Sequence, residues 1–152
     1  MNGKTIKDLK VGDTAFFEKT ITDADVILFA GVSGDLNPVH IDELYAKTSI
    51  FKKRIVHGGL VNALFSTVLG TQLPGNGTIY MGQNSKFLKP VFLGDTIKAT
   101  VTVGEIIEEK NRVVLNTVAY NQNGDIVVSG TAMVMPPRWN TNYYKKWWIN
   151  LA

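Results

Sequence analysis

The chain has 152 residues, 45% of them hydrophobic and 19% charged, which is typical of a single globular domain. It contains no cysteine and only two histidines, so disulfides, thiolate chemistry and cysteine-bound zinc are excluded and no metal site is expected. The net charge of +3 equals the contribution of Arg138, Lys145 and Lys146, and the formally neutral remainder gives little support to nucleic-acid binding.

No apolar stretch approaches the roughly 18–20 residues needed to cross a bilayer, and the N-terminus lacks the apolar segment of a secretory signal. We therefore expect a soluble, cytoplasmic protein with a domain over residues 1–137 and no membrane partner. Residues 138–152 form a distinct tail that holds all three tryptophans. The tail is interpreted as a strap packed on the subunit or its neighbour, or as an expression remnant; a membrane-surface segment is the alternative.

Residues 13–22 have the composition of a strand. Thr22, followed three residues later by Asp25, predicts a capping box at the start of a helix. Apolar residues after the cap give that helix one buried face, and the glycines of 31–34 end it.

The segment after this helix contains a proline, Pro38. Pro38 disfavours helical backbone at Asn37, so residues 35–40 are predicted to form an irregular loop, and 42–47 a short helical turn. Residues 58–73 contain no charge, and a helix that is apolar on nearly every side is usually buried in a core.

The rest of the chain alternates between apolar and polar residues as strands do, with an Asn-Gly hairpin turn at 122–124. The pattern predicts an α+β fold in which a curved antiparallel sheet wraps around the buried helix. The expected strands cover residues 78–88, 96–103, 112–120 and 126–135.

Asp35 and His40 lie five residues apart in the proline-stiffened stretch. A carboxylate beside an imidazole can orient the ring and prepare a base that works near neutral pH. On pattern alone the structural alternative is favoured, with Asp35 capping a turn and His40 starting the next helix.

His57, Gly58 and Gly59 open the uncharged helix. The first amides of a helix have no intrahelical acceptor, and glycine lets a ligand oxygen approach them closely, so this turn could hold a carbonyl oxygen as it gains charge. The alternative is that the glycines only permit tight packing. Asn62 and Ser66 share a helix face with Gly58 and could bind a ligand or pair with the sheet.

Basic residues flank these elements. Lys86 and Lys89 follow the helix on a predicted strand and could grip phosphates at a pocket mouth, although a solvated face is the ordinary interpretation of each one. The chain has no Walker loop, and no dinucleotide-binding GxGxxG precedes a helix.

The motifs Asp35-Leu36-Asn37-Pro38-Val39-His40, Arg54-Ile55-Val56-His57-Gly58, Phe65-Ser66 and Phe87-Leu88-Lys89-Pro90-Val91, followed by Gly94-Asp95, occur in this order. Together they resemble the MaoC-like family, and most of all its short bacterial (R)-specific enoyl-CoA hydratases. The resemblance covers about residues 5–136.

The resemblance implies a hot-dog fold, a homodimer or higher oligomer, and reversible hydration of a trans-2-enoyl-CoA thioester to the (R)-3-hydroxyacyl product, without metal or redox cofactor. Asp35 and His40 would activate the water, and the Gly58 amide would polarise the thioester carbonyl. Further candidate substrate-binding residues are Ser66, Asn62, Gly59, Asn37, His57, Lys86 and Lys89. Gly59 stands where many relatives carry a bulkier apolar residue, which could reshape the acyl pocket.

Three other functions stay open at this point. A dehydratase acting on acyl-carrier-protein thioesters would use the same chemistry on another carrier. A hot-dog thioesterase commonly places a carboxylate on the central helix or an adjacent segment, and the uncharged helix argues against the helix-borne version. A non-catalytic acyl-thioester-binding module is disfavoured by the intact Asp35, His40 and His57-Gly58 motifs.

Overall fold

The computed structural model describes residues 3–138 of the chain. Arg138 is therefore the only described residue of the tail predicted over 138–152. In chain order the elements are η1 (Ile6–Asp8), β1 (Thr14–Thr20), α1 (Asp23–Ser33), α2 (Pro38–Ile41), α3 (Glu43–Thr48), α4 (Gly58–Thr71), β2 (Ile79–Phe87), β3 (Thr96–Ile107), η2 (Glu108–Lys110), β4 (Arg112–Tyr120) and β5 (Ile126–Met135).

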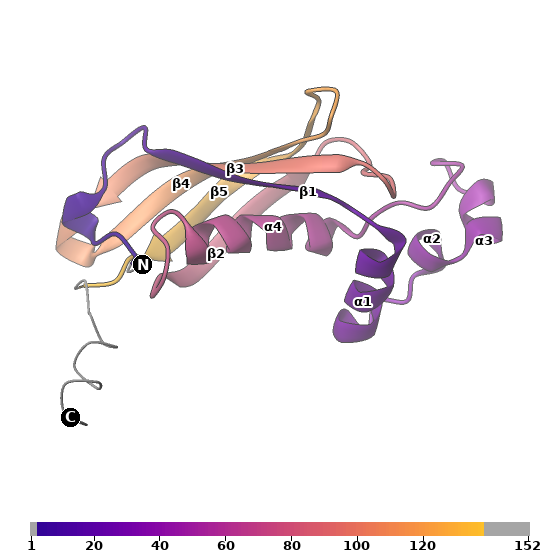
Figure 1. Cartoon of the computed structure of the whole chain (residues 1–152), viewed down its shortest axis with the longest axis horizontal. Coiled ribbons are helices and arrows are strands. Elements are labelled where there is room, and N and C mark those ends of the chain that lie inside the picture. Colours follow the sequence, from indigo (N-terminus) through magenta and orange to yellow (C-terminus); the bar gives the residue numbers. More distant parts are fainter. Residues whose placement is uncertain (1–2, 139–152) are drawn as a thin grey trace, which may run out of the picture.

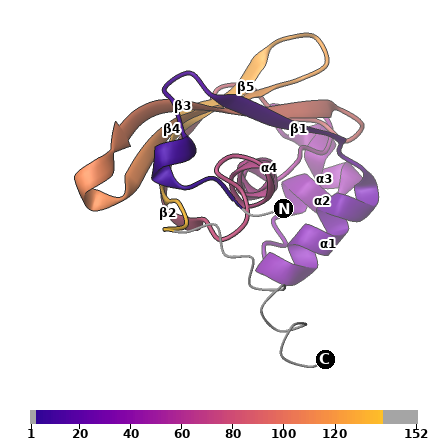
Figure 2. The ribbon, with the colours of Figure 1, turned by 60° about the vertical axis from the view of Figure 1, so that its left-hand side comes forward.

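The five strands form one antiparallel sheet in the order β1-β3-β4-β5-β2, so β1 and β2 are its edges. The sheet curves around α4, which lies along its concave face (Figures 1 and 2). This arrangement confirms the predicted α+β class and the hot-dog fold.

The core lies between α4 and the sheet. Inward-facing strand residues are fully buried against one side of the helix, as the alternation in β3 predicted. The helix contributes Val61, Leu64, Phe65, Val68 and Leu69.

Within residues 3–138, only one side of α4 is covered, although its uncharged sequence predicted burial on nearly every side. Gly59, Ala63 and Ser66 are exposed on the opposite face. The cause is geometric, because the single curved sheet packs on one side of the helix and leaves the other open.

Helices α1, α2 and α3 gather beyond the end of the sheet at which α4 begins (Figure 1). The predicted capping box of α1 is present, since Thr22 accepts from the Asp25 amide and Asp25 accepts from the Thr22 amide. Gly34 ends the helix with a left-handed backbone, at φ 77°.

The irregular loop predicted over 35–40 is wrong in its second half, where Pro38 begins α2. Proline restricts only the residue before it and suits the first helical turn, where its missing N–H needs no partner. Asn37 therefore serves as the N-cap, and its Oδ1 accepts from the Val39 amide.

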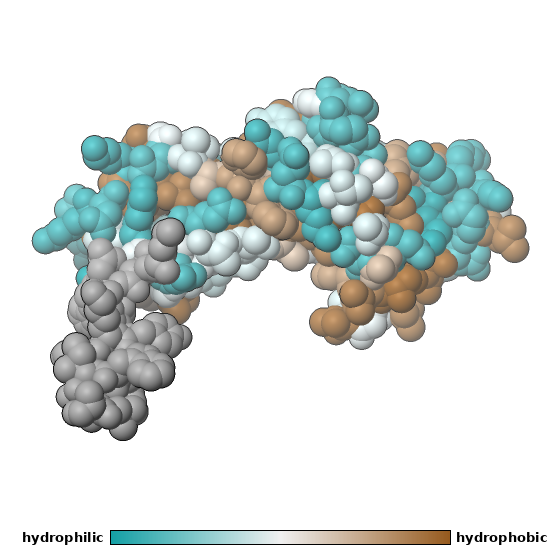
Figure 3. Space-filling model, in the orientation of Figure 1, coloured by the Kyte–Doolittle hydropathy of each residue, from teal (hydrophilic) through white to brown (hydrophobic). Residues whose placement is uncertain are grey.

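Apolar side chains gather on the free side of α1 (Figure 3), where Ile27, Leu28 and Val32 are exposed. None of the helices in the described part of the chain is long and apolar enough to span a membrane.

Candidate active site

The segment Arg54–His57 runs beside residues 35–41 and holds them by hydrogen bonds. The Ile55 amide donates to the Val39 carbonyl over 3.2 Å, and the Arg54 Nε donates to the His40 carbonyl over 2.6 Å. Residues that are distant in sequence are thereby fixed to the turn that leads into α4.

His40 is buried, and its ring orientation is set by a main-chain contact. Its Nδ1 lies 2.8 Å from the Ile55 carbonyl oxygen, which can only accept, so Nδ1 carries the proton and Nε2 is the basic nitrogen. Nε2 lies 4.0 Å from Asp35 Oδ2, on a side chain that is 49% exposed. The structure thus brings together the two residues predicted to act as a pair.

The 4.0 Å separation exceeds a direct hydrogen bond and suits a water held between the two atoms. Burial lowers the pKa of His40 below its ordinary value of 6.5. The Ile55 carbonyl opposes this effect, nearby His57 lowers the pKa further, and the Asp35 carboxylate raises it. The net result is an imidazole that favours its neutral, proton-accepting form.

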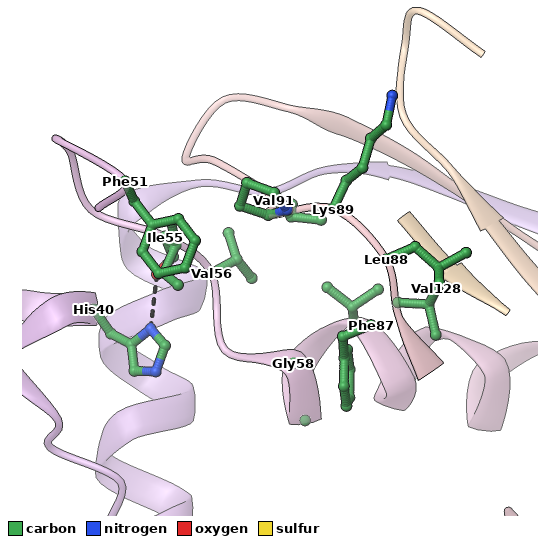
Figure 4. A pocket seen from close by; sticks show the side chains of 13 residues that line it. His40, Phe51, Ile55, Val56, Gly58, Phe87, Leu88, Lys89, Val91 and Val128 are labelled. Atoms are coloured by element: carbon green, nitrogen blue, oxygen red, sulfur yellow. Dashed lines mark hydrogen bonds between the residues drawn. The ribbon is translucent and has the colours of Figure 1, made fainter. Parts of the chain in front are cut away.

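His40 and the first turn of α4 line one cavity of about 520 Å³ (Figure 4). Gly58 and Gly59 form part of its wall, as predicted. The other walls are mainly apolar, from Phe51, Ile55, Val56, Val61, Phe87, Leu88, Pro90, Val91 and Val128, and Lys89 also lines it.

Gly58 is the first residue of α4, and the N-cap residue His57 makes no side-chain hydrogen bond to the turn. The opening amides of a helix are oriented donors at the positive end of its dipole. The Phe87 ring lies against this turn (Figure 4), where a Cβ on Gly58 would be 2.6 Å from Phe87 Cε1. A side chain at this position would therefore have to displace the Phe87 ring or the helix turn.

Four predicted binding residues lie away from this cavity. Asn62 and Ser66 line a second hollow of about 370 Å³ beside β2, where Asn62 Oδ1 accepts from the Ser85 hydroxyl. Asn37 caps α2, and Lys86 lies on β2 opposite Ser129.

Two others have defined partners. The Lys89 ammonium lies 2.7 Å from Asp125 Oδ1, so this cavity-lining residue is ion-paired in the described structure. His57 is 1% exposed and is directed at Asp35 and His40, not at the cavity.

Two site residues were not assigned a role from sequence. Phe87 belongs to a quoted motif, but only the fold places its ring on Gly58. Arg54 also belongs to a quoted motif, and the structure shows it joining the His40 carbonyl to Asp23, whose Oδ1 lies 2.7 Å from Arg54 Nη2. No local signal indicated either contact, because each partner is at least 14 residues distant.

Asp35, His40 and His57 could also offer a cation one atom each, all within 4.8 Å of one another. His40 Nδ1 and His57 Nε2 already face main-chain carbonyls. The carboxylate, His40 Nε2 and His57 Nδ1 are the donors that remain for a cation in this cluster.

Comparison with known proteins shows which family the chain resembles. The profile of the MaoC like domain matches residues 10–124. The chain is 48% identical to an (R)-specific enoyl-CoA hydratase of Rhodospirillum rubrum, over 86% of this chain and 90% of that protein. It is 44% identical to the enzyme of that name from Aeromonas caviae, over 86% and 98% of the two chains.

Among solved structures, the unliganded R-hydratase PhaJ1 of Pseudomonas aeruginosa superimposes with a TM-score of 0.85 at 47% identity. The match covers 90% of this chain and 88% of that one. The architecture and the sequence therefore lead to the same set of relatives.

Proposed function

The chain belongs to the MaoC-like family, and from that premise we propose that it is an (R)-specific enoyl-CoA hydratase. One observation carries the proposal: a neutral-favouring imidazole next to a carboxylate shares a cavity with the first turn of an uncharged helix. Hydration of a conjugated thioester needs a base for water and a donor for the carbonyl oxygen, and these groups supply both.

The reaction follows from this arrangement. The Gly58 amide donates to the thioester carbonyl oxygen and makes the β-carbon electrophilic. A water between Asp35 and His40 attacks that carbon while Nε2 accepts its proton, so the π electrons move toward the carbonyl as an enolate. Return of a proton to the α-carbon completes net addition of water.

Each group has a separate electrostatic role. The enolate oxygen carries the developing charge and lies at the positive end of the α4 dipole. The Asp35 carboxylate stabilises the imidazolium that forms transiently on His40. Coenzyme A is part of the substrate, and the proposed steps use no metal or redox cofactor.

A homodimer is part of the proposal. The exposed face of α4 presents Gly59, Ala63 and Ser66 without charge, and the neighbouring edge strand β2 exposes Ile79 and Met81. An open, apolar edge strand is stabilised when a second chain pairs with it. Light scattering should give twice the 16.8 kDa of the chain, and a monomeric mass would refute this part.

The activity is tested by incubating the purified protein with crotonyl-CoA and following loss of the enoyl-thioester absorbance together with formation of (R)-3-hydroxybutyryl-CoA. Asp35→Asn and His40→Gln should each reduce kcat about 100- to 10,000-fold, the range of general acid–base catalysis, without unfolding the protein. Near-normal turnover in either variant would contradict the assignment.

The competing functions give other products. Free coenzyme A instead of the hydrated thioester would identify a thioesterase. Turnover of a carrier-protein thioester with no reaction of the coenzyme A thioester would identify a carrier-protein dehydratase, and absence of turnover on both would indicate a binding module.

A further inference from the structure

His57 makes the contacts that connect the parts of the site, although it does not line the cavity. It is 1% exposed and immediately precedes Gly58. Its Nε2 lies 3.0 Å from the main-chain oxygen of Asp35. A carbonyl oxygen only accepts, so Nε2 carries the proton, and Nδ1 is buried without a hydrogen-bond partner among the described residues.

The ring of His57 is also held by two aromatic neighbours. It stacks on the His40 ring with centroids 3.8 Å apart and planes inclined by 28°. It meets the Phe29 ring of α1 at 5.0 Å and 54°. One side chain thus touches both members of the proposed acid–base pair and α1.

Resting on the proposed hydratase function, we propose that His57 is a positioning residue that aligns Asp35 and His40 with each other and with the first turn of α4. Its hydrogen bond fixes the main chain from which the Asp35 carboxylate projects. Its stacking fixes the plane of the His40 ring and thus the direction of Nε2. Because His57 immediately precedes Gly58, it holds both Asp35 and His40 in a fixed position relative to the helix turn that receives the carbonyl oxygen.

This role has an electrostatic component. Two stacked imidazoles repel each other when both are charged, so His57 biases His40 toward its neutral form, consistent with the lowering that His57 exerts on the His40 pKa. The charged or titratable groups around His40 are Asp35 from the preceding loop, His57 from the start of α4, Arg54 at the His40 carbonyl, and Lys89 across the cavity.

Two variants separate the contacts. His57→Gln retains an N–H that can reach the Asp35 carbonyl and removes the stacked ring. His57→Phe retains the ring and removes the donor. Displacement of reacting groups by about 1 Å costs up to roughly 100-fold in rate, so each variant should lower kcat about 10- to 100-fold. KM should change less than about threefold, because the residue does not line the cavity.

A spectroscopic measurement distinguishes positioning from support of the fold. The chain has two histidines, so a His57 variant retains only the His40 imidazole signal, whose titration NMR follows directly in the free protein. Both variants remove the imidazole that lowers the His40 pKa, so the His40 midpoint should rise in both. The acid limb of kcat/KM should move to higher pH with it.

Val68→Ala serves as the control, because Val68 is fully buried in the same helix and away from the site. It should lower Tm and leave kcat and the His40 titration unchanged. Folded His57 variants with kcat within twofold of the parent, or with an unmoved His40 midpoint, would overturn the proposal. If the parent protein hydrates no enoyl thioester while the midpoint still moves, the hydratase function fails and the His57–His40 coupling stands.

Discussion

Substitution of Gly58 by Ala tests the first turn of α4 with the smallest possible change. The added Cβ would lie 2.6 Å from Phe87 Cε1, 2.9 Å from Cζ and 3.1 Å from Cδ1. Carbon atoms in contact are normally about 3.5–4.0 Å apart, so the ring or the helix turn must move by about 1 Å. Phe87 is 57% exposed, so its ring can move without emptying the core.

The expected consequence is a loss of rate without a comparable loss of stability. A surface ring that swings toward solvent costs about 0.5 kcal/mol or less in free energy of unfolding. The part of the movement that the helix turn takes up displaces the Gly58 amide, and a donor displaced by about 1 Å costs up to about 10²-fold in rate, whereas its removal costs about 10²- to 10³-fold. Gly58→Ala should therefore lower kcat/KM for crotonyl-CoA about 30- to 100-fold with little change in Tm.

A double-mutant cycle identifies the cause. Phe87→Leu removes the ring atoms that clash, so Gly58→Ala combined with Phe87→Leu should recover at least about tenfold in kcat/KM, a coupling of about 1.4 kcal/mol. Gly31→Ala is the matched control, because a Cβ there meets no atom within 4 Å, and its kcat should be normal. A fully active Gly58→Ala, or a double variant as impaired as Gly58→Ala alone, would refute the reasoning.

Three further predictions concern the pH dependence of stability, the wall of the cavity and the hydrogen bonds of Arg54. Burial lowers the pKa of His40 in the folded protein, so on acidification the unfolded chain binds a proton at His40 before the folded chain does. The free energy of unfolding should therefore fall as pH drops from about 6.5, the ordinary value of histidine, through the lower pKa of the folded state. Urea titrations of His40→Gln should lack this loss of stability. Gly59 lines the cavity, so Gly59→Met should narrow it and lower kcat/KM for eight-carbon relative to four-carbon enoyl-CoA about fivefold or more. An unchanged ratio would remove Gly59 as a determinant. Arg54→Lys loses the Nε donor to the His40 carbonyl and should cost about 1.5–3 kcal/mol in chemical denaturation. Asp23→Asn, at a partner that is 65% exposed, should cost less than about 1 kcal/mol.

Elements that depend on neighbours in sequence were predictable. The capping box at Thr22 and Asp25 joins residues three apart, and the alternation in β3 reports one buried face directly. The Asn-Gly turn at 123–124 defines the last hairpin on the same local basis. The predicted loop was wrong at α2, because the restriction that Pro38 places on Asn37 was extended to the residues after it.

The arrangement of the site was only partly accessible. Family resemblance predicted that Asp35, His40 and Gly58 act together, and the structure places His40 and Gly58 on one cavity. The separation of Asn62 from that cavity was not predictable, because helix periodicity defines a face and does not show that Asn62 lies beside β2, where it accepts from the Ser85 hydroxyl.

The base His40 lies on α2, and the carbonyl-oxygen donor Gly58 lies on α4. Residues 54–57 connect these two elements, so they are important to the site although they have no acid–base role. Arg54 holds the His40 main chain, the Ile55 carbonyl sets its tautomer, and His57 holds both its ring and the Asp35 main chain. Residues 54–57 lead directly into the Gly58 turn. The base and the carbonyl-oxygen donor are therefore positioned by contacts from one continuous piece of backbone.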